Sequence, residues 1–249
     1  MKAFRSLLLF SILIILYPGC APKIEYNGFE EDKLFTQSEL YQLPTYRSLG
    51  EAMEAPDSVY KIVIFNKDLT KVPRQVAKLK YLNILELTMN KLSDLPEYVG
   101  DMIYLQDLYV ARNQFDEVPP VVFEIENLRC VIFDHNRISE IPVEILSKPG
   151  IEELHFGHNQ ITAIPDELYS IEQLKVLKLD QNKIGYLDPA IGNLVNLRVL
   201  DLQGNNLYEV PYELTRLKNL SELNLRHNQI ERPVVDSLRK ALPDTRVVF

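Results

Sequence analysis

The side chains of this sequence that most suggest chemistry are four histidines and a cysteine, Cys130. Imidazole and thiolate groups are usual ligands of zinc, which takes four of them in a tetrahedron. Two of the histidines lie 23 residues apart, and a third is close to one of them; the four are His135, His155, His158 and His227. Neither a cysteine nor a carboxylate clearly completes a tetrahedral set, although Asp134 adjoins His135. The sequence therefore predicts no metal site.

Catalysis by Cys130 would need a general base within hydrogen-bond distance of its sulfur. A 23-residue step in the sequence places His155 only diagonally opposite Cys130, on the next strand, too far for that bond without rearrangement. Asp134 and Asp180 come two repeats apart, about 10 Å by strand spacing, which is wider than the carboxylate pair of a retaining glycosidase. These residues predict no catalytic site, so the chain is not expected to be an enzyme.

A repeat that runs through most of the chain carries these residues. Asparagine recurs at a step of 23 residues within one pattern of aliphatic residues, as in Leu85-Glu-Leu87-Thr-Met-Asn90-Lys-Leu92. An earlier unit, from Ile62 to Leu69, has Lys67 at the asparagine position. The repeated asparagines are Asn90, Asn113, Asn136, Asn159, Asn182, Asn205 and Asn228. A step of this length is typical of solenoids, in which each repeat is one coil stacked on the next.

Each repeat begins with a short strand, whose residues alternate between the interior and the exposed face. Leu85 and Leu87 are therefore predicted to point into the core. Their neighbours Ile84, Glu86 and Thr88 are predicted to point outwards. The asparagine amide is expected to lie in the following turn, bonded to backbone groups of its own and the next turn. Losing such a buried partner costs about 1–3 kcal/mol, so we assign the asparagines to the scaffold.

Most repeats continue to a proline and then to a stretch with an apolar residue every three or four positions, as in Pro165-Asp-Glu-Leu168-Tyr-Ser-Ile171. The whole unit, L-x-x-L-x-L-x-x-N-x-L followed by x-x-L-P, resembles the 23-residue bacterial form of the leucine-rich repeat, in about eight repeats over residues 59–249. This resemblance implies an α/β solenoid with a curved parallel sheet on the concave face and short helices on the convex face. It also implies, for most members, binding to another protein.

The segments on either side of the repeats are expected to close the ends of the core, because a terminal coil has no neighbour to cover it. Residues 44–58 predict an N-terminal capping helix, since Ser48 and Glu51 have capping-box spacing and Pro56 ends the run. Residues 238–249 predict a last helix and a closing strand.

Residues 1–19 have the pattern of a secretory signal peptide, in which a cationic leader precedes an apolar stretch, here residues 7–16, too short to span a bilayer. The motif Leu16-Tyr17-Pro18-Gly19-Cys20 resembles the lipobox of bacterial lipoproteins. This resemblance implies a lipid on Cys20, a tether over residues 20–43 and a membrane anchor in the bacterial cell envelope. The outer membrane is favoured because no aspartate follows the cysteine. The alternatives are cleavage with release, or an uncleaved anchor.

The outward face of the predicted sheet offers a candidate binding surface. Its first four repeats carry mainly apolar and aromatic residues, whereas its last three carry charges and amides. Exposed apolar strips usually mark interaction sites. The predicted partner-binding residues are Phe65, Ile84, Glu86, Met89, Tyr109, Arg112, Ile132 and His155. Alternatively, the tether itself covers the strip, through Ile24, Tyr26, Phe29, Leu34 and Phe35.

The composition limits the kinds of partner. The 249 residues carry a net charge of -8 and no basic stripe, so nucleic acid is not an expected partner. The predicted function is that of an exported, lipid-anchored monomer that binds another protein through its concave face, without a cofactor. A glycan- or cell-wall-binding module on the same scaffold is the second hypothesis, and an enzyme using Cys130 is the third.

Overall fold

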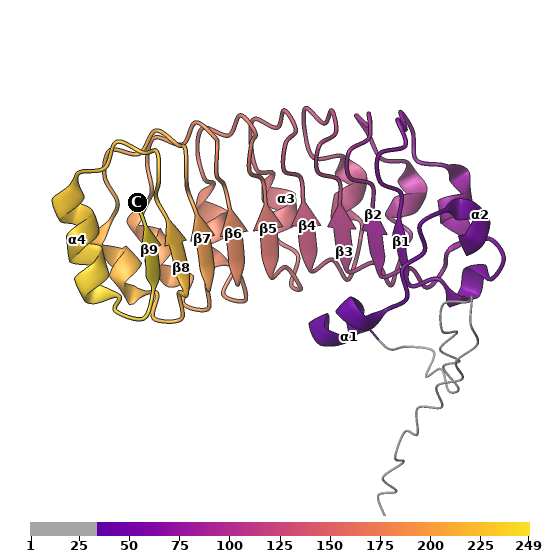
Figure 1. The fold of residues 1–249 in the computed structure, drawn as a ribbon, viewed down its shortest axis with the longest axis horizontal. Helices are drawn as coiled ribbons and strands as arrows, with labels where there is room; N and C mark the ends of the chain where they lie inside the picture. The colour runs from indigo at the N-terminus through magenta and orange to yellow at the C-terminus, as the bar shows by residue number, and fades with distance from the viewer. Residues whose placement is uncertain (1–33) are drawn as a thin grey trace, which may run out of the picture. The chain divides into compact units, whose positions relative to one another are not determined.

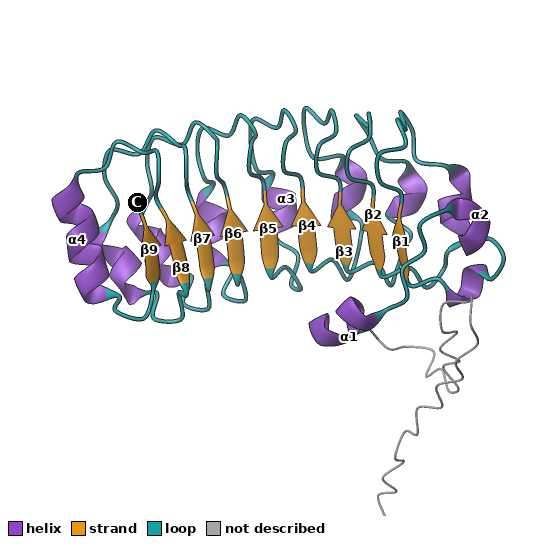
Figure 2. Ribbon diagram, in the orientation of Figure 1, coloured by secondary structure: helices purple, strands orange, loops and turns teal. Residues whose placement is uncertain are grey.

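A computed structural model describes residues 34–249, which form one compact unit. The described residues contain nine short strands in one parallel sheet, arranged in sequence order (Figures 1 and 2). The strands are β1 Lys61–Val63, β2 Ile84–Glu86, β3 Asp107–Tyr109, β4 Cys130–Ile132, β5 Glu153–His155, β6 Val176–Lys178, β7 Val199–Asp201, β8 Glu222–Asn224 and β9 Arg246–Val248. The solvent-facing side of this sheet is called the strand face below.

Short helices, the 3₁₀ helices above all, cover the side of the coils opposite the strand face, whereas α1 (Gln37–Gln42) lies beside the strands (Figure 2). Most are 3₁₀ turns that begin directly after the repeated proline, as the sequence predicts. The 3₁₀ helices are η1 Pro56–Ser58, η2 Arg74–Lys78, η3 Glu97–Val99, η4 Pro120–Phe123, η5 Asp166–Ser170, η6 Pro189–Asn193 and η7 Tyr212–Arg216. The α-helices are α1 Gln37–Gln42, α2 Leu49–Ala52, α3 Val143–Leu146 and α4 Arg232–Ala241. The predicted α/β solenoid is confirmed.

The register of the sheet follows the repeat. From β1 to β8, each strand residue lies opposite the residue 23 positions later, so that Glu86 faces Tyr109 and Ile132 faces His155. Leu85 and Leu87 are fully buried, as predicted. The rows of side chains expected on the strand face are therefore continuous from coil to coil.

The repeated asparagines join neighbouring coils through their amides. The Asn159 amide oxygen accepts a bond from the Ile138 N–H at 2.9 Å. Its nitrogen donates to the Phe156 carbonyl of its own coil, at 3.1 Å, and to the Phe133 carbonyl of the preceding coil, at 3.0 Å. The prediction that these bonds run to the next coil was wrong. The amide instead reaches back, where it satisfies backbone groups that the preceding coil leaves open.

A second set of amides, which was not predicted, links the coils near the starts of the strands. Asn196, for example, donates to the Glu172 carbonyl of the preceding coil at 2.8 Å. Asn127 and Asn219 make the equivalent bonds. The asparagine–leucine pair that recurs just before these strands is the signal that could have revealed this set.

The segments that flank the repeats form α2 and η1 at one end of the solenoid, and α4 and β9 at the other. The Ser48 hydroxyl accepts a bond from the Glu51 N–H at 3.2 Å and caps α2. At the other end, α4 buries Val235 and Leu238 against the last coils, and β9 extends the sheet.

The predicted signal peptide 1–19, the lipidation site Cys20 and the tether up to residue 33 lie outside the described residues. Among the helices of residues 34–249, none is both long and apolar enough to cross a bilayer.

Candidate functional site

The last ten residues of the predicted tether are part of the folded unit rather than a free spacer. This docked segment, residues 34–43, contains α1 and lies beside the N-terminal ends of the first strands (Figure 1). Leu40 and Leu43 are buried in a small cluster with Tyr60 and Ile84. The cluster is separate from the main core, so the segment packs onto the outside of the sheet.

Polar bonds fix the docked segment to the sheet over several coils. The Phe35 N–H donates to the Gln106 side-chain oxygen at 3.0 Å, and the Gln106 side-chain nitrogen donates to the Phe35 carbonyl at 2.8 Å. Gln37 donates to the Glu153 carboxylate, Oε1, at 2.8 Å. Together with the apolar cluster, these bonds place the segment against strands β2 to β5.

The docked segment changes the predicted binding surface. Ile84 is only 2% exposed because α1 covers it, so its prediction as an exposed contact residue was wrong. Tyr109 is half-buried under the same cluster, and its hydroxyl donates to Asp107 Oδ2 at 2.7 Å. Of the tether residues proposed to cover the strip, Phe35 packs edge-on against Tyr60, with ring centroids 5.4 Å apart, whereas Leu34 stays exposed. The other three, Ile24, Tyr26 and Phe29, lie outside the described residues.

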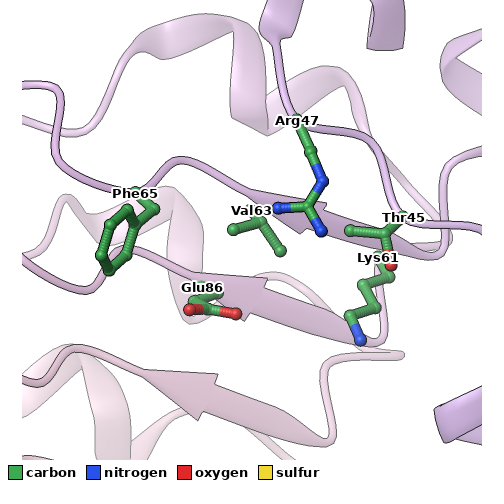
Figure 3. A pocket seen from close by; sticks show the side chains of 6 residues that line it. All are labelled: Thr45, Arg47, Lys61, Val63, Phe65 and Glu86. Atoms are coloured by element: carbon green, nitrogen blue, oxygen red, sulfur yellow. The ribbon is translucent and has the colours of Figure 1, made fainter.

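The part of the strand face that α1 leaves open begins at β1 and β2. Phe65 and Met89 are 44% and 39% exposed, and Arg112 is also exposed. Glu86 and Ile132 are half-buried. Phe65 borders a hollow of about 380 Å³, in which Arg47 extends over Val63 (Figure 3). The residues lining this hollow are Thr45, Arg47, Lys61, Val63, Phe65 and Glu86.

Two of the histidines form a stacked pair beside this open area. The rings of His135 and His158 lie nearly parallel with centroids 3.9 Å apart. Burial, together with the nearby His158 ring and Arg112, lowers the pKa of His135 below its ordinary value. The Arg112 guanidinium can only donate, and its Nη2 lies 3.1 Å from His135 Nε2. His135 is therefore neutral near pH 7 and accepts this bond.

A buried charge cluster lies at the starts of β3 to β5. It consists of Asp107, Arg129, Cys130, Glu153 and His155. Arg129 donates to both Asp107 oxygens, at 2.8 and 2.9 Å, and to Glu153 Oε1 at 3.2 Å. The neighbouring His155 imidazole and the Arg129 guanidinium hold the pKa of Glu153 down, at about 2. Arg129 also lies 3.6 Å from the Glu152 carboxylate, which Lys175 pairs as well, so this guanidinium contacts three carboxylates.

Cys130 and His155 occupy places in this cluster that differ from their predicted ones. His155 is only 8% exposed, so its prediction as a surface contact for a partner was wrong. Its Nε2 lies 3.6 Å from Glu153 Oε2, and the Cys130 sulfur lies 3.8 Å from the same oxygen. Burial and the Asp107 and Glu153 carboxylates raise the pKa of the Cys130 thiol well above its ordinary value. A buried neutral thiol is a poor nucleophile, so the geometry gives the enzyme hypothesis no support.

The predicted sites do not include Asp107, Arg129 and Glu153 as a cluster. The signal was present, because Asp107, Cys130 and Glu153 are successive members of one row on the strand face. Arg129 was not part of the prediction because it precedes its strand, and the alternation of the strand assigns only strand residues to the outward face.

The comparisons with known proteins agree with the repeat. A family model described as "Leucine rich repeat" matches residues 126–184 and 174–230. A leucine-rich repeat protein of Leptospira interrogans is 30% identical, with a TM-score of 0.65, over 78% of this chain and 55% of that one. The chain thus spans about half the length of the Leptospira protein. Among curated protein sequences, none matches this chain.

Two further structures share the fold. Internalin C2 of Listeria monocytogenes is 22% identical over 78% of this chain and 81% of that one, with a TM-score of 0.68. The ectodomain of a plant membrane receptor kinase from Arabidopsis thaliana, in complex with Casparian strip integrity factor 2, is 25% identical over 70% of this chain and 22% of that one, with a TM-score of 0.60. Such repeats are commonly scaffolds for protein–protein interaction, and no catalytic family is indicated. By its repeat, its sheet and these relatives, the chain belongs to the leucine-rich repeat family.

Proposed function

We propose that this chain is an exported, lipid-anchored protein that binds another protein through the open part of its strand face. The observation that carries the proposal is the docked segment, because it is a polypeptide already bound to this face. Its contacts combine two buried leucines, Leu40 and Leu43, with amide bonds to Gln106 and Glu153. A foreign segment of similar chemistry is expected to bind beside it.

The adjoining open area offers the side chains that such binding needs. Phe65, Met89 and Arg112 come from successive coils, whose strands lie about 4.8 Å apart. Aromatic, methionine and arginine side chains are enriched in interfaces, and arginine is also enriched among their hot spots. The hollow next to Phe65 gives a partner's side chain a place to insert. The bound ligand of the related plant receptor adds support from a relative of the same fold.

Replacing Phe65 and Met89 together by alanine is expected to weaken partner binding roughly 30- to 1,000-fold, since each of the two anchors contributes about 1–2 kcal/mol. The purified chain is immobilised, proteins are captured from envelope extract, and the dissociation constant is then measured for the captured partner. The matched control is Tyr208→Ala with Tyr212→Ala, which removes two exposed aromatic rings, one in η7 and one four residues before it, outside the strands. Equal binding by both double variants would contradict the proposal. Capture that is lost when glycans are removed from the extract would favour the glycan hypothesis instead.

Anchoring is tested separately at Cys20. Mass spectrometry of the mature protein is expected to find a chain that starts at this residue and carries acyl groups. Cys20→Ala is expected to move the protein from the membrane fraction to the soluble fraction, while Cys130→Ala leaves it in the membrane fraction. A mature N-terminus that begins elsewhere, or an unmodified Cys20, would contradict lipid anchoring.

A further inference from the structure

Three metal-ligating side chains meet on the strand face at β4 and β5. Cys130 is paired directly with Glu153 across the two strands, and His155 lies two residues further along on the same face. One ligand atom from each of the three side chains lies within 4.8 Å of the other two. The side chains thus converge from a rigid pair of neighbouring strands.

The separations between these atoms fit a shared cation. Zinc lies about 2.3 Å from a thiolate and about 2.0–2.1 Å from nitrogen or oxygen, which places tetrahedral ligands about 3.3–3.6 Å apart. The Glu153 Oε2 atom is 3.6 Å from His155 Nε2 and 3.8 Å from the Cys130 sulfur. The nitrogen–oxygen separation exceeds a hydrogen bond. Both of these separations are within a few tenths of an ångström of coordination geometry, and the third, between the Cys130 sulfur and a ring nitrogen of His155, is below 4.8 Å.

His155 supplies an independent sign of a missing ligand. Its Nε2 is buried and makes no hydrogen bond within the described part of the chain. Buried polar atoms are nearly always satisfied, and an exception calls for an explanation such as an ion. In a neutral imidazole this nitrogen can carry the lone pair that binds a metal.

The charge and orientation of Glu153 point the same way. Gln37 and Arg129 both donate to its Oε1, at 2.8 and 3.2 Å, so Oε2 is left to face Cys130 and His155. Bonds of this kind orient metal ligands in known sites. Around the site, the two cations Arg129 and Lys175 face three carboxylates, Asp107, Glu152 and Glu153, which leaves one negative charge in excess. A divalent cation bound with a thiolate would add one net positive charge and balance it.

We propose that Cys130, Glu153 and His155 form a binding site for a zinc-like divalent cation, with water as the fourth ligand. Thiolate and imidazole ligands in a tetrahedron favour zinc over magnesium or calcium. Binding releases the Cys130 thiol proton to solvent, because only the thiolate ligates the metal. Since Gln37 belongs to the docked segment, the occupied site also holds that segment to the sheet.

The test uses cobalt as a spectroscopic probe of the purified full-length chain under anaerobic conditions. One equivalent of Co²⁺ is expected to give the near-ultraviolet thiolate-to-cobalt band and the intense visible absorption of a tetrahedral site, and Zn²⁺ is expected to displace both. Cys130→Val should abolish the thiolate band. Valine suits this position because Val176 and Val199 occupy the same row, and circular dichroism verifies that the variant folds. His155→Gln should abolish the tetrahedral absorption.

Two control variants separate this site from other thiols and histidines. Cys20→Ser and the double variant His135→Gln with His158→Gln are both expected to keep the full spectrum. Zn²⁺ should raise the Tm of the wild type and of both controls, but not that of Cys130→Val. The proposal is overturned if the wild type gives no thiolate band, if Cys130→Val keeps it, or if either control loses it.

Discussion

Replacing Arg129 by methionine is expected to lower the free energy of unfolding by about 3–5 kcal/mol. This is the usual cost of removing one partner of a buried ion pair, because the other charge is left buried without compensation. The Arg129 side chain is 11% exposed and its partner Asp107 is 3% exposed, so water does not replace the lost contacts. Three donated bonds, two to Asp107 and one to Glu153, disappear together. Methionine keeps most of the side-chain volume, and the loss therefore reports on charge rather than on a cavity.

Urea denaturation with a chelator present measures this loss without any contribution from bound metal. The matched control is Arg137→Met, because Arg137 pairs with Asp116 at 3.8 Å on the surface, where both side chains are more than half exposed. Exposed pairs of this kind contribute about 0–1 kcal/mol. If the two variants lose the same stability, the buried charge cluster does not stabilise the fold in the way that its geometry indicates.

The fold could be predicted from the sequence because the same pattern of apolar residues, asparagine and proline recurs in successive repeats. Alternation along one strand assigned Leu85 and Leu87 to the core, and the step of 23 residues then assigned their equivalents in the other coils. Stacking coils also fixes the register, so the row that contains Glu86, Tyr109 and Ile132 followed without further information.

The docked segment could not be placed in the same way, because it belongs to no repeat. Its helix has a readable start, since Thr36 and Glu39 form a reciprocal capping box. That spacing predicts a helix but not the surface to which it binds. The decisive contacts, from Leu40 to Ile84 and from Phe35 to Gln106, join residues far apart in sequence, with no periodic pattern to connect them.

The buried charge cluster could be predicted from the sequence only in part. The register alone places Cys130 opposite Glu153 and next to Asp107. It does not give the direction in which long side chains turn, and the His155 ring turns back along its own strand towards Glu153. Side-chain direction depends on rotamer and on covering groups such as Gln37. Row positions therefore identified neighbours but not the cluster.

Asn182→Ala is expected to destabilise the chain by about 2–4 kcal/mol, because a buried group that loses its partner costs about 1–3 kcal/mol. The Asn182 oxygen accepts from the Ile161 N–H at 2.9 Å, and its nitrogen donates to the Phe156 and Leu179 carbonyls at 2.8 and 3.0 Å. Two of these three groups belong to the preceding coil. The substitution therefore weakens the contact between two central coils, and the urea transition is also expected to broaden, since each coil of a solenoid is stabilised mainly by its neighbours.

The matched control is Asn196→Ala, which deletes the same amide from the other set of asparagines. Asn196 is exposed and makes one bond to the preceding coil, to the Glu172 carbonyl at 2.8 Å, which water can replace. The substitution is expected to change the free energy of unfolding by no more than about 0.5 kcal/mol and to leave the width of the urea transition unchanged. If Asn182→Ala lost as little stability as Asn196→Ala, water would have to replace the amide in the turn of a central coil. The apolar core alone would then hold the coils together. A large loss of stability in Asn182→Ala and a small one in Asn196→Ala would show that the buried asparagines hold the coils together. The exposed asparagines, which carry the same amide, would then contribute little.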